Sequence, residues 1–314
     1  MADVAQRARP ARAGAAPPAR PTITDRARAE RRLGWLLCAP AVAAMALVTL
    51  YPVVYALWLS LQRADLRFPS QTSFVGLRNY ADVLTSRIWW GDVATTLVIT
   101  VASVVIELAI GMAVAMVLNR AIFARRTVRT SVLIPYGIIT VVASLAWKYA
   151  FTPGTGFINT WAGTSTDLLT KRVPSLAAIT ATEVWKTTPF MALLLLAGLA
   201  LVPDELHEAA RVDGANALQR FFKITLPLMK PAILVALLFR TLDAFRIFDS
   251  IFILTRGANG TESVSILGYN QLINRLNLGI GSAVSVLIFL CVLAIALVYV
   301  KGFGTSLVGQ EARR

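Results

Sequence analysis

Eight ionisable side chains stand inside long apolar runs of this sequence, where a charge is unfavourable. Four are acidic and four are basic: Glu107, Lys148, Glu183, Lys186, Arg240, Asp243, Arg246 and Asp249. A charged group at the centre of a bilayer costs about 2.5–3.5 kcal/mol on insertion scales, so such groups pair with one another or line a path for a polar substrate. The equal numbers of the two signs predict pairing, and the depth of each group decides whether it can also face a path.

Aromatic side chains alternate with several of these charges. A ring combined with charged or amide groups suits a sugar, which presents apolar ring faces and hydroxyl edges. We therefore predict that ten residues form a substrate path: Glu183, Trp185, Lys186, Phe190, Arg240, Asp243, Phe245, Arg246, Phe248 and Asp249. We expect the centre of that path chiefly at Lys186, Arg240, Asp243 and Phe245.

Four of these charges are spaced by three residues, from Arg240 to Asp249. On one continuous helix neighbours at this spacing touch, while Arg240 and Asp249 point to opposite sides. The spacing predicts the pairs Arg240–Asp243 and Arg246–Asp249. Two roles are open for these residues: the charges of each pair only neutralise each other, or they bond to a partner chain. All four could not then face one path. Glu107, alone in its apolar run, is predicted to be a packing contact inside the helix bundle.

The composition indicates an all-α, polytopic membrane protein. Of 314 residues, 56% are hydrophobic and 15% are charged, against about 25% charged in soluble domains. Disordered chains need low hydrophobicity, and two Cys with one His favour neither a disulfide scaffold nor a zinc site. The apolar runs predict six transmembrane helices, at about 34–61, 95–118, 131–151, 176–202, 231–254 and 280–300.

The positive charges predict which side of the membrane each loop faces. The net charge is +14, but the basic residues lie between the apolar runs and not on one face, which argues against a nucleic-acid partner. With the N-terminus inside, the cytoplasmic segments hold more than twice as many Lys and Arg residues as the external loops. We predict a disordered basic tail over 1–32, a membrane domain over 33–302 and a C-terminal tail over 303–314, with both tails in the cytoplasm.

The cytoplasmic loop 203–230 contains the signals of a short helix. Asp204 and Glu205 suit the first turn of a helix, and Gly214 suits a left-handed position after its end, which predicts a helix over 204–213. A helix that projects from a membrane domain can dock on another protein. The alternative is an ordinary amphipathic loop that lies on the lipid headgroups.

The same loop resembles the EAA motif of ABC-importer permeases. The matching residues are Glu208, Ala209, Ala210, Gly214, Ile224, Leu226 and Pro227. Residues 74–80 are similar to the segment before the second span in carbohydrate permeases of the MalF type. Residues 183–190 and 239–249 look closest to actinobacterial permeases that import trehalose.

This resemblance implies a type I importer fold in the plasma (inner) membrane and transport by alternating access. The partners would be a second, different permease, two copies of an ABC ATPase, and an extracellular substrate-binding lipoprotein that delivers a sugar, trehalose or another disaccharide. The helix over 204–213 would be the coupling helix, with Glu208 and Asp213 as its polar contacts. The sequence contains no G-x-x-x-x-G-K-[ST], so ATP and Mg²⁺ are expected on the partner ATPase, and we expect this chain to be no enzyme.

Two other functions remain open. The chain could be an ion-coupled secondary transporter whose buried carboxylates carry protons, although it lacks an inverted repeat. It could also be a membrane subunit that docks an ATPase and transports nothing. Dependence of uptake on ATP or on a proton gradient separates the first alternative from an importer.

Overall fold

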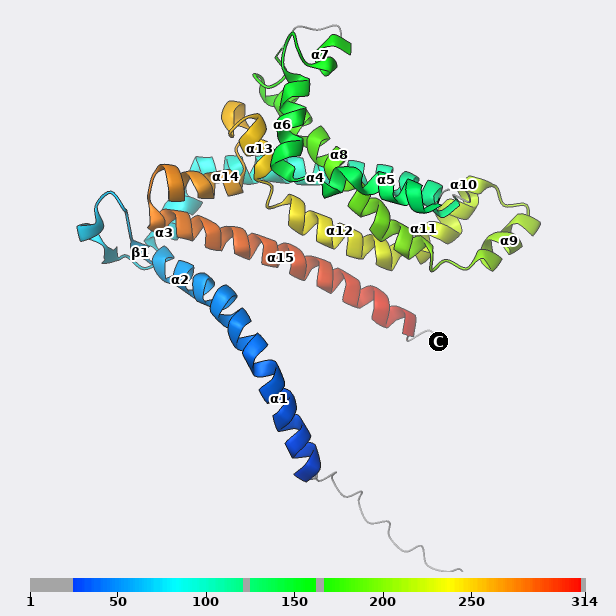
Figure 1. Cartoon of the computed structure of the whole chain (residues 1–314), viewed down its shortest axis with the longest axis horizontal. Coiled ribbons are helices and arrows are strands. Elements are labelled where there is room, and N and C mark those ends of the chain that lie inside the picture. Colours follow the sequence, from blue (N-terminus) through cyan, green and yellow to red (C-terminus); the bar gives the residue numbers. More distant parts are fainter. Residues whose placement is uncertain (1–24, 121–124, 162–166, 312–314) are drawn as a thin grey trace, which may run out of the picture. The chain divides into compact units, whose positions relative to one another are not determined.

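The computed structural model describes residues 25–120, 125–161 and 167–311, and it forms two compact units, 1–53 and 54–314. In the first unit α1 (Asp25–Met45) continues through the π-helical turn η1 (Ala46–Leu50) into α2 (Tyr51–Ser60), which ends in the second unit (Figure 1).

The second unit is almost entirely helical. Its remaining elements, in chain order, are β1 (Gln62–Arg63), η2 (Pro69–Gln71), β2 (Ser73–Phe74), α3 (Arg78–Leu84), α4 (Arg87–Arg120), α5 (Arg125–Gly137), α6 (Thr140–Phe151), α7 (Phe157–Trp161), α8 (Arg172–Leu199), α9 (Asp204–Val212), α10 (Ala217–Arg220), η3 (Phe221–Thr225), α11 (Leu226–Leu228), α12 (Lys230–Ala244), α13 (Asp249–Leu254), η4 (Ala258–Gly260), α14 (Val264–Tyr269), η5 (Asn270–Asn274) and α15 (Leu278–Glu311). A small sheet pairs β1 with β2 in antiparallel register.

Six candidate membrane spans account for the long helices. In the described part of the chain, three helices are long and apolar enough to cross a membrane: Arg32–Ser60, Arg87–Asn119 and Leu278–Gly302. Three bent pairs pass the same test together: Thr130–Gly137 with Thr140–Phe151, Arg172–Leu199 with Asp204–Val212, and Ala217–Leu228 with Lys230–Ala244. Each pair gives at most one further span, up to six in all, which agrees with the predicted all-α membrane fold; in the second pair the predicted span 176–202 corresponds to α8, and α9 begins after it.

Helices extend into both predicted tails. The chain is already helical from Asp25, so the prediction of disorder over 1–32 is wrong for residues 25–32, while 1–24 lie outside the described residues. At the other end the candidate span ends at Gly302, while α15 itself continues to Glu311, so the predicted tail over 303–314 is helical as far as residue 311; its cytoplasmic location stays a prediction, and 312–314 are again outside the described residues. At both ends a helix extends past its apolar segment into polar residues, and composition alone does not predict where such a helix ends.

The core of the second unit lies between α4, α8 and α12, which pack against one another. Small residues allow the close approach. A Cβ atom on Gly198 would lie 2.3 Å from the Cβ of Ala232 in α12, and one on Gly111 of α4 would lie 2.9 Å from the Cγ of Met191 in α8. Lipid tails are as apolar as the side chains, so membrane helices associate largely through such close contacts.

Two helix breaks interrupt predicted spans. Between α5 and α6 the chain turns by 90°. Between α12 and α13 the predicted continuous helix 231–254 is wrong, because four residues, 245–248, separate the two helices. There the amides of Arg246 and Ile247 donate to carbonyls only three residues back, at 3.1 Å each, and Phe248 has φ −136°.

The segment between α2 and α4 is fixed by polar contacts. The Asn79 side-chain amide donates to the carbonyls of Ser60 and Gln62 at 2.8 Å each, so α3 is tied to the start of the hairpin. In the hairpin, the Arg67 guanidinium donates to the Asp65 carboxylate at 2.6 and 2.9 Å, and the Arg67 backbone N–H donates to it at 2.9 Å. These hydrogen bonds lower the pKa of Asp65 to about 2.

Candidate functional site

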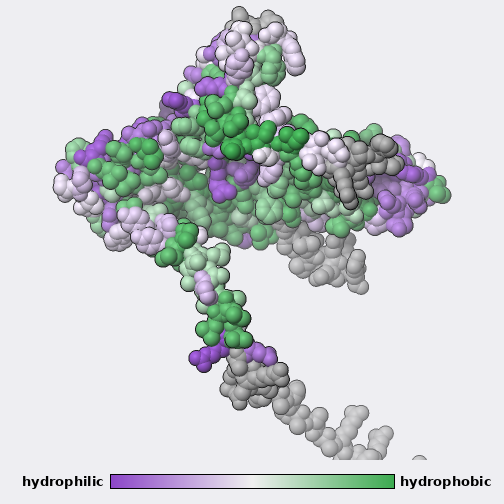
Figure 2. Space-filling model, in the orientation of Figure 1, coloured by the Kyte–Doolittle hydropathy of each residue, from purple (hydrophilic) through white to green (hydrophobic). Residues whose placement is uncertain are grey.

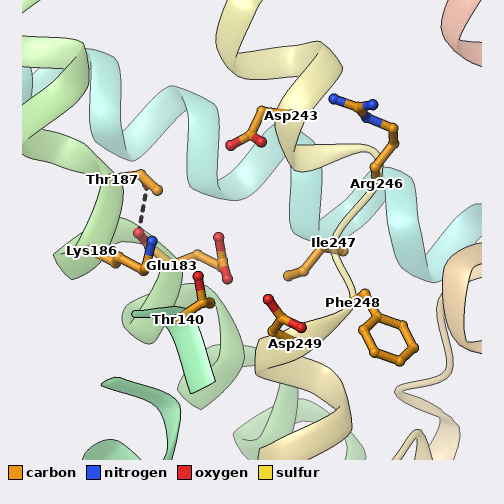
Figure 3. A pocket seen from close by; sticks show the side chains of 9 residues that line it. All are labelled: Thr140, Glu183, Lys186, Thr187, Asp243, Arg246, Ile247, Phe248 and Asp249. Atoms are coloured by element: carbon orange, nitrogen blue, oxygen red, sulfur yellow. Dashed lines mark hydrogen bonds between the residues drawn. The ribbon is translucent and has the colours of Figure 1, made fainter. Parts of the chain in front are cut away.

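A polar pocket of about 160 Å³ lies where α6, α8, α12 and α13 meet in the second unit. Nine residues line it: Thr140, Glu183, Lys186, Thr187, Asp243, Arg246, Ile247, Phe248 and Asp249 (Figure 3). Both helix breaks contribute, because Thr140 opens α6 and residues 246–248 form the connection between α12 and α13. Figure 2 shows a hydrophilic area in the middle of this unit, surrounded by apolar surface.

The lining offers hydrogen-bond donors and acceptors to one ligand. Figure 3 shows the carboxylates of Glu183, Asp243 and Asp249 and the hydroxyl of Thr140 turned toward the middle of the group, while the Phe248 ring points away. Lys186 adds a cation, and its Nζ lies 5.6 Å from the centre of the Tyr136 ring, within cation–π distance. A polyhydroxy compound can use both kinds of partner, since each hydroxyl both donates and accepts.

Behind this pocket Arg240 is the centre of a buried ion network. Its side chain is 1% exposed. Nε and Nη2 donate to Glu107 of α4 at 2.5 and 3.0 Å, and Nη2 also lies 3.4 Å from Glu183 of α8. Nη1 donates to Asp243 of α12 itself at 2.7 Å. A buried charge is tolerated where it is paired and hydrogen-bonded, which this network achieves by joining three helices.

Hydroxyl groups extend the network to α6 and α13, the helices that follow the two breaks. Thr187 donates to Glu107 at 2.8 Å, and Ser250 of α13 donates to the other carboxylate oxygen of Glu183. Ser144 of α6 lies 3.5 Å from the Ser250 hydroxyl. The network therefore connects α4, α6, α8, α12 and α13 directly behind the pocket.

The second candidate site is the exposed helix α9, which has no buried residue. The structure confirms the predicted helix and its end: Gly214 has φ +79°, its N–H donates to Arg211 O at 3.0 Å, and Ala215 N–H donates to Ala210 O at 2.8 Å. This is the Schellman arrangement, in which a left-handed glycine closes a helix. Glu208 and Ala209 are exposed on the helix surface.

Apolar side chains surround α9 without covering it. Leu206 and Val212 of α9 are 44% and 89% exposed, and Leu218 and Phe222 of the following turns are 70% and 60% exposed. Of the apolar residues in these turns, Phe221 is partly buried against the core. An exposed apolar patch beside a polar helix is typical of a protein–protein interface.

The sequence profile of the family described as binding-protein-dependent transport system inner membrane component matches residues 90–302. The chain belongs to this family. It is thus a permease, and the loop that resembles an EAA motif and the exposed α9 lie inside the matched region.

Curated relatives and solved structures agree with this assignment. The permease is 57% identical over 283 residues to the trehalose transport system permease protein SugA of Mycobacterium tuberculosis, covering 90% of this chain and 92% of that protein. It is 40% identical over 285 residues to the trehalose/maltose transport system permease protein MalF of Thermococcus litoralis, covering 87% and 94%. A bacterial ABC transporter that imports alginate has the same fold, with a TM-score of 0.74, 22% identity, and coverage of 88% and 97%.

The structure brings together six of the ten predicted path residues. The six in the pocket are Glu183, Lys186, Asp243, Arg246, Phe248 and Asp249. The sequence predicted that Arg240 and Asp249 point to opposite sides of one continuous helix. This prediction is wrong, because α12 ends at Ala244 and the connection to α13 brings residues 246–249 into one pocket with Glu183 of α8. Among the described residues no ion pair joins Arg246 to Asp249, and Arg246 Nε donates to the Leu242 carbonyl at 3.3 Å.

The other four predicted path residues lie outside the pocket. Arg240 is behind it, and Phe245, 2% exposed, belongs to a buried apolar cluster that includes Trp89 and Leu267. Trp185 packs edge-on against Trp147 and Phe190 stacks on Tyr136, with ring centres 5.7 and 5.2 Å apart. Neither Trp185 nor Phe190 is among the residues that line the pocket.

The sequence interpretation missed three lining residues and part of the network. Thr140, Thr187 and Ile247 are uncharged and gave no signal among many similar residues. Glu107 was predicted as a packing contact, but it forms an ion pair with Arg240, which was predicted to pair with Asp243 or to bond to a partner chain. The signal was present: a lone acid inside one span needs a cationic partner, which a neighbouring span can supply.

Proposed function

We propose that this permease forms half of the membrane pathway of an ATP-driven importer for a disaccharide, with trehalose as the first candidate. The observation that supports a sugar is the mixed lining of the pocket, with carboxylates, cations and a hydroxyl around one space. Relatives whose names specify trehalose and maltose support the choice of disaccharide.

A second permease is needed to complete the site. Sites for small molecules usually enclose about 300–1,000 Å³, and this pocket of about 160 Å³ is smaller and open, with the Asp243 side chain 66% exposed. We infer that a different permease subunit forms the opposite wall.

The ATPase partner would dock on α9. In this proposal two copies of an ABC ATPase bind ATP and Mg²⁺ on the cytoplasmic side of the permease pair, and one copy binds α9. Glu208 and Asp213 make the polar contacts of α9, and the small side chains of Ala209 and Ala210 allow the ATPase to approach closely. Leu226 and Pro227 direct the chain from this loop back into the membrane. A substrate-binding lipoprotein would deliver the sugar from outside, as the family description of a binding-protein-dependent system suggests.

Uptake by the reconstituted complex tests this proposal. We expect uptake of radiolabelled trehalose into proteoliposomes that requires ATP on the ATPase side and the binding protein on the other side. Uptake that follows a proton gradient without ATP would establish the secondary transporter, and ATPase docking without uptake of any disaccharide would establish a non-transporting subunit.

Single cysteines at Ser70 and Gln219 test the orientation. With both termini in the cytoplasm, an impermeant maleimide added outside labels position 70 and not position 219. Labelling of both positions from outside would contradict six spans with α9 inside.

A further inference from the structure

Arg240 touches two carboxylates of the pocket but is not part of the pocket surface. Its Nη1 lies 2.7 Å from Asp243 and its Nη2 lies 3.4 Å from Glu183, and both acids line the pocket. With its side chain 1% exposed, Arg240 cannot be reached by a ligand. Any effect it has on a ligand must therefore pass through residues that line the pocket, and the two acids are the ones that it contacts directly.

Glu107 allows Arg240 to remain charged at this depth. It is completely buried, it receives two of the guanidinium hydrogen bonds, and it also accepts one from Thr187. Arginine presents five N–H donors in a rigid planar fork, whereas lysine has one compact ammonium group. Only the fork can hold acids from α4, α8 and α12 at the same time.

We propose that Arg240 is a positioning residue that fixes Glu183 and Asp243 as hydrogen-bond acceptors, and so determines which disaccharides the pocket accepts. This inference rests on the proposed sugar-transport function. Related sugars differ in the direction of single hydroxyl groups. A site with fixed acceptors rejects a hydroxyl that points elsewhere, because buried polar groups are then left unpaired, whereas mobile acceptors adapt to it.

A purely structural role predicts a different result. If Arg240 only holds helices together, its replacement lowers the amount of assembled transporter, or the transport rate for every sugar by the same factor. Selectivity between two transported sugars is therefore the decisive measurement, because equal losses leave the ratio of the two rates unchanged.

The experiment uses the complete transporter in proteoliposomes and compares Arg240→Lys with the double variant Glu107→Leu/Arg240→Met. The double variant removes both buried charges together, so its folding does not depend on the missing arginine. The matched control is Asp65→Leu/Arg67→Met, which removes an ion pair of similar length that lies outside the pocket. The readout is the ratio of ATP-dependent uptake rates for trehalose and maltose at saturating concentrations, per assembled complex.

We expect the ratio to change at least about fivefold in both Arg240 variants and to stay at the wild-type value in the control. An unchanged ratio in the double variant, with both rates lowered equally, would overturn the positioning role.

A cysteine in the pocket gives a second readout that needs no transport. In a chain with Cys38→Ser and Cys291→Ala, Thr140→Cys places a single thiol in the lining, and trehalose should protect it from a small maleimide. We expect Arg240→Lys to raise the half-protecting trehalose concentration at least about fivefold. If trehalose protects the thiol equally well with and without Arg240→Lys, the positioning role of Arg240 is wrong, but the proposed sugar transport is not contradicted. If no disaccharide protects the thiol or is taken up by the wild-type transporter, the proposed function itself is wrong, and the inference with it.

Discussion

Helix α9 and the network behind the pocket are built in opposite ways. Within α9 the capping contacts are local: Gly214 and Ala215 close it onto carbonyls three and five residues earlier, and no residue of the helix is buried. The network joins Arg240 to residues 57 and 133 positions away, and its centre is almost completely buried. A local, exposed element can be altered without unfolding the protein, whereas removal of one partner from a buried ion network leaves the other charge unpaired and destabilises the fold.

The largest effect is expected from Gly214→Val. A β-branched residue resists the left-handed conformation that Gly214 adopts at φ +79°, at a cost of about 1–3 kcal/mol, so the helix end should shift. We expect ATP-dependent uptake to be abolished, while the amount of permease in the membrane stays near the wild-type level. Uptake assays with quantitative immunoblots of the membrane fraction measure both.

A matched control separates conformation from bulk. Gly91 has open space around its Cβ position and no positive φ, so Gly91→Val adds the same side chain without the same strain and should retain most uptake. Glu208→Ala should also abolish uptake while the isolated ATPase keeps its basal activity. Wild-type uptake by both loop variants would remove α9 from the mechanism.

The next largest effect is expected from Glu107→Leu, and it concerns stability. The change leaves the Arg240 guanidinium without its main partner, and breaking one side of a buried ion pair costs about 3–5 kcal/mol. We expect a marked loss of permease from the membrane and a lower midpoint of thermal unfolding for the purified complex. The double variant Glu107→Leu/Arg240→Met should recover most of this loss, and no recovery would mean that the loss does not come from the unpaired guanidinium of Arg240.

A smaller effect is expected from Asp243→Asn. The Asp243 side chain is 66% exposed, so the amide can replace the carboxylate without burying an unpaired group, while one charged acceptor of the pocket is lost. We expect trehalose uptake to fall by about tenfold, equivalent to about 1.4 kcal/mol, with normal assembly. Asp243→Asn with unchanged uptake of every disaccharide tested would place the substrate path elsewhere.

This contrast also explains how much could be predicted from the sequence. The helix α9 and its left-handed glycine were predictable, because capping residues and spacing act within a few positions. The six spans were predictable, because membrane insertion depends on local composition. The pocket was only partly predictable: its charged residues stand out, but the break at residues 245–248 depends on packing, and it moved Phe245 into the core and Asp249 into the lining.

The smallest effect is expected from Asp65→Asn, which sharpens the comparison between exposed and buried ion pairs. The Asp65–Arg67 pair is 2.6 Å long and the Arg240–Glu107 pair 2.5 Å, but the Arg67 side chain is 54% exposed, and surface pairs contribute little. The pKa of Asp65 lies below its usual range, so any stabilisation by this pair is present above that range and is lost as the pH falls toward 2. Between about pH 6 and pH 8 the pair stays charged. We therefore expect wild-type uptake and thermal stability for Asp65→Asn across this range, and a loss comparable to that of Glu107→Leu would show that burial does not distinguish the two pairs.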